Sequence, residues 1–294
     1  MTLRCFAACA MAWLLAGCAS PEPAADSSSV PATGQVPSAD GVPIAYEVRG
    51  SGEPALVLIH GWTNDRTIWG EHPRTLSRTH RVVTVELAGH GQSGAGRTNW
   101  TLDAFGEDVA AVVQHLELPS VVLVGFSMGA QAAIEAAERL ADRVVGIVIV
   151  DTFHDPEQRS TPAPPEQMEA MFRANWGDTA FLRQFAFTPD APDSLVQMLA
   201  ANSSPQPREH WFPALHAVAA WMRGERQAAL ERLSVPVAAI NTTRVPTNVE
   251  AWRRYVPSFT VDTLQGVGHA GILLQRVEDF DARLLALVER FSNR

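Results

Sequence analysis

The chain has 294 residues, of which 46% are hydrophobic and 7% aromatic, a composition typical of a globular protein with a substantial core. It carries 23 basic against 32 acidic residues, a net charge of −9, and every basic residue is an arginine. No basic cluster or stripe occurs, which argues against nucleic acid or an anionic membrane surface as a partner.

The first twenty residues, MTLRCFAACAMAWLLAGCAS, join one early arginine to an apolar run that ends in small residues. The run is too short for a permanent membrane span, so it predicts a secretory signal. Its end, LAGC at 15–18, resembles the bacterial lipoprotein signal. That resemblance implies a signal peptide over 1–17, a lipid on Cys18 and, with Ala19 next, anchoring in the outer membrane of the cell envelope. An ordinary signal peptide with an incidental cysteine is the alternative.

Residues 18–40 are rich in Pro, Ala, Ser and Gly and contain few large apolar side chains. Such a segment buries too little surface to offset the entropy lost on ordering. We therefore expect a flexible tether between the lipid and the folded domain.

After the tether, short β-branched runs alternate with helical patterns, which is typical of parallel βαβ construction. Several strand candidates are apolar throughout, as expected when helices cover both faces of a sheet. The pattern predicts an α/β core made of residues 41–154 and 233–294. Strands are expected at 43–48, 56–60, 81–87, 121–126, 144–151, 236–241 and 259–264, and helices at 101–117, 128–141, 247–255 and 276–292.

The interval 155–232 interrupts this alternation. It has no strand-like apolar run but is rich in Pro, Met, Phe and Trp. Structureless loops of that length are rare, so the interval predicts a helical cap over the sheet. We expect most of its aromatic side chains to form the core of the cap and some to face a cleft below it.

The stretch VVLVGFSMGAQAAIEAA places Gly125, Ser127 and Gly129 in the pattern G-x-S-x-G, after an apolar strand and before an alanine-rich helix. The glycines allow a sharp strand-to-helix turn that holds the central residue in a strained conformation. Ser127 is therefore predicted to be a nucleophile at a helix N-terminus, where backbone N–H groups also point. An idle serine in a turn of small residues is the alternative interpretation.

A serine hydroxyl is a poor nucleophile at neutral pH and needs a base. The candidate is His269, in the glycine-flanked segment LQGVGHAGILL after the last predicted strand. The oxyanion of a tetrahedral intermediate needs two N–H donors. Met128, next to the serine, is expected to supply one, and Trp62, in the HGW segment after strand 56–60, the other. His60 of that segment is interpreted as a structural anchor.

These segments, in this order, resemble the motifs of the α/β-hydrolase family, in particular its lidded esterases and lipases. The matching segments are HGW at 60–62, GHGQSG at 89–94, GFSMG at 125–129 and GVGH at 266–269. The resemblance spans the chain from about residue 41 to 294. It implies an α/β-hydrolase fold with a helical cap inserted after the sixth strand, and a serine enzyme.

The family usually places the acid that orients the histidine after the strand written here as PVAAIN, where residues 241–244 read NTTR. Asp151, at the end of strand 144–151, is the candidate replacement, because haloalkane dehalogenases and certain lipases take their acid from that earlier strand. Asp155 is a second candidate. A serine–histidine dyad steered by Thr243 or by a water is a third.

The leading hypothesis is a serine hydrolase that cleaves a carboxylic ester of an apolar small molecule or lipid through an acyl-enzyme. A lipoprotein that binds without efficient catalysis, and a perhydrolase, lyase or C–C hydrolase, stay as alternatives. The histidines are scattered and the three cysteines lie at 5, 9 and 18, so we expect no metal site and no cofactor. We expect a monomer whose partners are its substrate and, through the lipid, the membrane.

Overall fold

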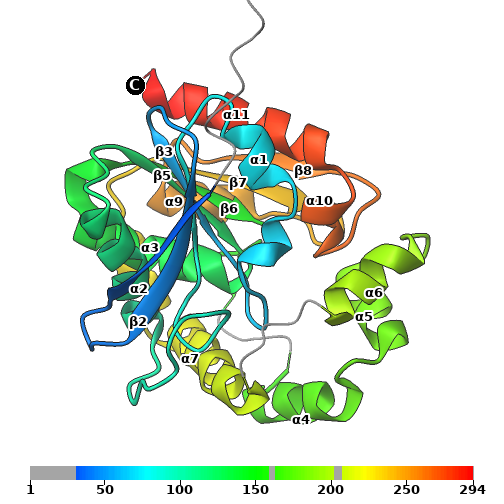
Figure 1. The fold of residues 1–294 in the computed structure, drawn as a ribbon. Coiled ribbons are helices and arrows are strands. Elements are labelled where there is room, and N and C mark those ends of the chain that lie inside the picture. The colour runs from blue at the N-terminus through cyan, green and yellow to red at the C-terminus, as the bar shows by residue number, and fades with distance from the viewer. Residues whose placement is uncertain (1–30, 159–162, 202–206, 294) are drawn as a thin grey trace, which may run out of the picture.

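The computed structural model describes residues 31–158, 163–201 and 207–293. Within them, eight strands form one sheet in the order β1-β2-β4-β3-β5-β6-β7-β8 (Figure 1). The strand β2 runs antiparallel to both of its neighbours, and the rest of the sheet is parallel. The strands are β1 (Ala32–Pro37), β2 (Pro43–Arg49), β3 (Ala55–Ile59), β4 (Val82–Val85), β5 (Val121–Phe126), β6 (Val144–Val150), β7 (Val237–Thr242) and β8 (Thr260–Leu264). All seven predicted strands are present.

Helices cover both faces of the sheet, as the wholly apolar strands predicted. In β3, Val57 and Ile59 pack in one core cluster, whereas Leu56 and Leu58 pack in the cluster on the opposite face. The first cluster joins the sheet to α2 (Leu102–His115), α3 (Met128–Leu140) and α9 (Val249–Tyr255), and the second joins it to α1 (His72–Leu76), α10 (Gly271–Leu274) and α11 (Val277–Ser292). The short helices α1 and α10 were not predicted, because four or five residues carry no helical periodicity.

The N-terminal limit of the folded domain differs from the prediction. Residues 32–37 form β1 and pair with β2, so the expectation of a tether reaching residue 40 is wrong for this stretch. Edge pairing uses backbone groups and needs no large side chains, which is why composition did not reveal it. The Ser38 hydroxyl then donates to Asp108 at 2.6 Å, and Asp40 accepts from Arg97 at 2.7 Å. The predicted signal peptide, Cys18 and the tether up to residue 30 lie outside the described residues.

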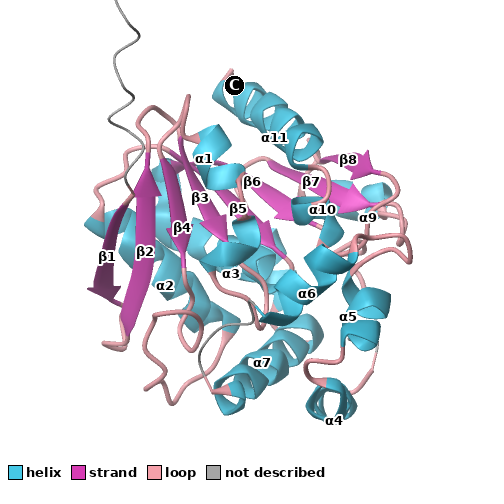
Figure 2. Cartoon of the chain, turned by 45° about the vertical axis from the view of Figure 1, so that its right-hand side comes forward, coloured by secondary structure: helices cyan, strands magenta, loops and turns pink. Residues whose placement is uncertain are grey.

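The interval 155–232 holds helices and, in its described residues, no strand. These helices are α4 (Pro165–Asn175), α5 (Thr179–Ala186), α6 (Asp193–Ala201), α7 (Trp211–Arg223) and α8 (Arg226–Glu231). They follow β6, the sixth strand in the chain. Helices α4 to α7 lie beyond the carboxyl ends of the central strands, which is where the functional loops of a parallel sheet gather (Figure 2).

Among the described helices, none is both long enough and apolar enough to cross a membrane.

Candidate active site

Ser127 lies at the sharp turn between β5 and α3. Its φ of +51° is in the left-handed region that non-glycine residues rarely adopt. The glycines at either side are required by space: a Cβ on Gly125 would lie 2.4 Å from the Cα of Ala130, and one on Gly129 would lie 2.3 Å from the carbonyl oxygen of Ile59. The sequence-based prediction of a strained turn is confirmed. Ser127 alone among residues 121–130 is not buried.

The loop after β3 passes directly beside the serine. A Cβ added to Gly61 would lie 3.0 Å from the Cβ of Ser127, a contact tighter than most, so glycine favours this close approach. Trp62 follows it and lines the same pocket as Ser127. Met128 is the first residue of α3, where N–H groups lack partners within the helix. Both residues assigned to an oxyanion hole therefore adjoin the serine.

His60 holds this loop to the sheet. Its Nδ1 lies 2.7 Å from the carbonyl oxygen of Gly61, to which it donates, and its Nε2 accepts from the N–H of Leu87 at 3.0 Å. Complete burial lowers the pKa of His60 to about 4, so the ring is neutral at pH 7. The interpretation of His60 as a structural anchor agrees with these contacts.

His269 and Asp151 meet beside the serine. The Nδ1 of His269 donates to the Oδ2 of Asp151 at 2.8 Å, although 118 residues separate them. The ring of His269 also packs on that of Phe126, the neighbour of the serine, with centroids 4.8 Å apart. Ser127 and His269 line one pocket. The structure thus brings together the predicted nucleophile after β5, the predicted acid after β6 and the predicted base in the loop after β8.

Asp151 is held in place by β7. The backbone N–H of Thr242 donates to its Oδ1 at 2.7 Å, and its own N–H donates to the carbonyl of Ile240 at 3.0 Å. Burial by itself would raise the pKa of Asp151, but the hydrogen bonds from His269 and Thr242 outweigh it and lower that pKa. The carboxylate is ionised at neutral pH.

The other two candidates for the third group lie elsewhere. Asp155 accepts from the Asn248 side chain at 3.2 Å and from the N–H of Glu157 at 2.8 Å. Thr243 is exposed after β7. Of the alternatives that the sequence left open, Asp151 is the one that contacts His269.

A second histidine, which the sequence reasoning did not consider, faces the same carboxylate. The Nε2 of His154 lies 3.8 Å from the Oδ1 of Asp151, too far for a hydrogen bond. Burial lowers the pKa of His154, partly opposed by the charge of Asp151. At pH 7 the ring is mainly neutral, and at this distance it makes no hydrogen bond to the carboxylate that His269 contacts. No local sequence pattern marks this contact.

The cap is bonded to the loops that carry the site. The indole N–H of Trp62 donates to the carbonyl of Trp211 in α7 at 2.6 Å. The ring of Trp62 also packs edge to face with that of Phe172 in α4, with centroids 4.6 Å apart. On the other side, the N–H of Ala270 donates to the carbonyl of Ala186 in α5 at 2.8 Å. A movement of the cap would therefore shift the residues next to both oxyanion hole and base.

Two hollows adjoin the site. The first, which we call the serine pocket, has a volume of about 90 Å³ and is lined by Ser127 and His269 together with Trp62, Phe126, Phe172 and Phe185. The second, which we call the outer cleft, has a volume of about 610 Å³ and includes Asp151 and His269. Most of the lining of the serine pocket is aromatic or aliphatic, which suits an apolar group.

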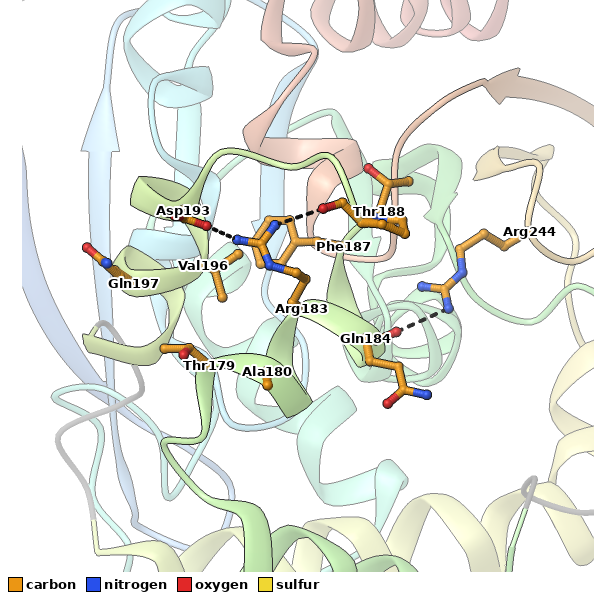
Figure 3. Close-up of a pocket in the computed structure, with 11 residues that line it drawn as sticks. Thr179, Ala180, Arg183, Gln184, Phe187, Thr188, Asp193, Val196, Gln197 and Arg244 are labelled. Atoms are coloured by element: carbon orange, nitrogen blue, oxygen red, sulfur yellow. Dashed lines mark hydrogen bonds and ion pairs between the residues drawn. The ribbon is translucent and has the colours of Figure 1, made fainter.

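A wider hollow of about 860 Å³ lies between α5 and α6 (Figure 3). Neither Ser127 nor His269 lines it. Arg183 crosses it, donating to the carbonyl of Ala191 at 2.5 Å and pairing with Asp193. Because the candidate nucleophile and base both lie outside this hollow, its larger volume does not make it the reaction site. Among the described residues, no group of three His, Cys, Asp or Glu side chains is arranged to hold a metal ion.

A family model for the alpha/beta hydrolase fold matches residues 54–189, from β3 through the serine turn to the end of α5. The chain has an α/β-hydrolase fold, to which this match and the solved structures both point. An esterase from Thermogutta terrifontis superposes with a TM-score of 0.73 over 88% of this chain and 99% of that one, at 21% identity. A likeness at this identity shows the fold alone.

Curated proteins are also similar to this chain in sequence. The pimeloyl-[acyl-carrier protein] methyl ester esterase of Nitrosospira multiformis is 38% identical over 117 residues, which are 38% of this chain and 43% of that protein. The 3-oxoadipate enol-lactonase 2 of Acinetobacter baylyi is 22% identical over 261 residues, 87% of this chain and 96% of that protein. The matches to the first curated relatives span only 28% to 35% of their length.

Proposed function

We propose that this α/β hydrolase is a serine esterase that works through an acyl-enzyme. The observation that carries the proposal is the 2.8 Å contact of His269 with Asp151, beside a serine held at the strained turn. An aspartate on Nδ1 fixes the tautomer whose Nε2 can take a proton from the serine hydroxyl. His269 lines the serine pocket, where that hydroxyl lies.

The steps follow from these positions. The Oγ of Ser127 attacks the ester carbonyl while His269 accepts its proton, and the N–H groups of Trp62 and Met128 stabilise the oxyanion. His269 then returns the proton to the leaving alcohol, and the acyl group stays on Ser127. Water, activated by the same histidine, hydrolyses the acyl-enzyme and restores the serine.

The alternative of a binding protein without efficient catalysis arose from the carboxylate missing after β7. The hydrogen bond of His269 to Asp151 supports an acid from β6 in that role, and so favours the esterase over the binding protein. The perhydrolase, lyase and C–C hydrolase alternatives differ from an esterase in their products. Analysis of the acid and alcohol released from a simple ester distinguishes them.

A fluorophosphonate probe tests the proposal, because it reacts with serines that a base activates. We expect the purified protein to be labelled at Ser127, and both the Ser127→Ala variant and the denatured protein to stay unlabelled. Absence of label on the folded wild-type protein would show that it is not a serine hydrolase.

We further propose an apolar, uncharged substrate and a location in the bacterial cell envelope. The aromatic lining of the serine pocket supports the first proposal. The LAGC segment at 15–18 supports the second. A panel of p-nitrophenyl esters tests the first: activity on anionic esters above that on butyrate or hexanoate esters would contradict it.

A further inference from the structure

The exposed large apolar side chains of the described residues gather at one place. They are Met171, Phe185 and Val245, exposed by 38%, 41% and 49%, and all three line the outer cleft. They come from two cap helices and from the loop after β7, which are far apart in the chain. An apolar surface assembled from separate elements beside His269 indicates a place for an apolar ligand.

The outer cleft and the serine pocket meet at two residues. His269 and Phe185 line both, whereas Ser127 and Trp62 line only the serine pocket. The ring of Phe185 lies 6.3 Å from that of His269 and 5.2 Å from that of Phe172, centroid to centroid. Phe185 therefore forms a wall between the two hollows, next to the base.

Arg244 holds this wall. Its guanidinium donates to the carbonyl of Gln184 at 3.4 Å, near the end of α5 (Figure 3). It also donates to the carbonyl of the next residue, Phe185, at 3.2 Å. Carbonyls at a helix C-terminus lack partners within the helix and attract a cation. The arginine thus ties the loop that carries Val245 to the helix that carries Phe185.

The order in which the bonds break indicates which arm of the ester lies in which hollow. The ester carbonyl must reach Ser127 and the oxyanion donors, which adjoin the serine pocket. The alcohol oxygen must reach His269 to receive its proton, and beyond His269 the outer cleft opens. The acyl arm therefore lies in the hollow of 90 Å³ and the alcohol arm crosses Phe185 into that of 610 Å³.

We propose that the outer cleft is the subsite for the alcohol arm, and that the substrate class is an ester of a short acyl group with a long apolar alcohol. This inference rests on the proposed esterase function and adds the placement of each arm. Met171, Phe185 and Val245 determine specificity by covering the alkyl chain.

Two ester series, followed by acid release from the purified full chain, test the placement. One series joins acetate to straight-chain alcohols from ethanol to octanol, and the other joins ethanol to acids from acetate to octanoate. We expect kcat/KM to rise by up to about fourfold per CH₂ along the alcohol series, which is the scale of burying one methylene. Along the acyl series it should level off or fall beyond a few carbons. The reverse order would overturn the inference.

Position 245 offers a matched pair of variants. Val245→Asp places a charge beside the alkyl chain, and Val245→Leu keeps the surface apolar. We expect the ratio of kcat/KM for octyl acetate to that for ethyl acetate to fall at least tenfold in Val245→Asp and to stay near wild type in Val245→Leu. An equal ratio in all three proteins would overturn the inference while leaving the esterase proposal intact. Failure of the wild type to hydrolyse any ester would instead refute the proposed function.

Discussion

The backbone N–H of Thr242 donates to the Oδ1 of Asp151 at 2.7 Å, which leaves Oδ2 to accept from His269. Thr242 closes β7, the strand after which this family usually places its acid. Here β7 supplies a backbone donor in place of a carboxylate, and the proposed acid lies at the end of the neighbouring strand β6. The exchange preserves what the histidine needs, because one ionised oxygen still faces its Nδ1.

Gly129 offers a test of the serine turn. In Gly129→Ala the new Cβ would lie 2.3 Å from the carbonyl of Ile59, so β3 or α3 must shift, at a cost of about 1–3 kcal/mol. We predict a lower free energy of unfolding in urea and much slower fluorophosphonate labelling of Ser127. Gly96→Ala is the matched control, because nothing lies within 4 Å of a Cβ there. Equal labelling rates in the two variants would show that the turn tolerates the methyl group.

Stability should fall in mild acid because of two buried histidines. An unperturbed histidine has a pKa of about 6.5. Burial lowers the pKa of His60 to about 4, and burial together with the neighbouring His60 lowers that of His90 to about 3. Below pH 6.5 the unfolded chain therefore binds protons that the folded chain does not, and stability is lost as the pH falls towards these values. Between pH 7 and pH 4, each histidine lowers the free energy of unfolding by about 3 kcal/mol.

The variant His90→Asn keeps a donor for the carbonyl of Ala88, which His90 contacts at 3.0 Å, but does not titrate. Urea unfolding of both proteins at pH 7 and pH 4 checks the prediction. We expect the difference in unfolding free energy between the two pH values to be smaller by about 3 kcal/mol in the variant. The same difference in both proteins would mean that His90 is not kept neutral by burial.

Sequence reasoning found those site residues whose environment is set locally. Ser127 follows from its own pentapeptide, and His269 from a glycine-flanked loop after the last strand. Asp151 stayed one of three candidates. Its position beside His269 depends on the pairing of β6 with β7 and on a φ of +44° at the strand end, and neither can be read from the local sequence. Sequence reasoning missed two local contacts that no residue pattern marks, the pairing of β1 with β2 and the approach of His154 to Asp151. It also missed the buried pair of His72 with Asp281, because 209 residues separate them.

The predicted lipid anchor can be tested by fractionation. A diacylated cysteine with a further acyl chain binds a bilayer far more firmly than one chain does. We predict that wild-type protein sediments with membranes, whereas Cys18→Ser is soluble or unprocessed. Cys9→Ser, within the predicted leader, is the control and should sediment like wild type. Wild-type protein found wholly in the soluble fraction would argue against lipidation.

The measurement that tests the Ser127–His269–Asp151 site most directly is kcat of Asp151→Asn on one p-nitrophenyl ester, beside wild type and Ser127→Ala. The new amide oxygen can still accept from Thr242, which turns the amide NH₂ towards the Nδ1 of His269 and favours the wrong tautomer. We predict that kcat falls by roughly 10³ to 10⁴ while the urea midpoint stays near that of wild type. A loss of less than about tenfold, with Ser127→Ala inactive, would contradict the assignment of Asp151 as the acid.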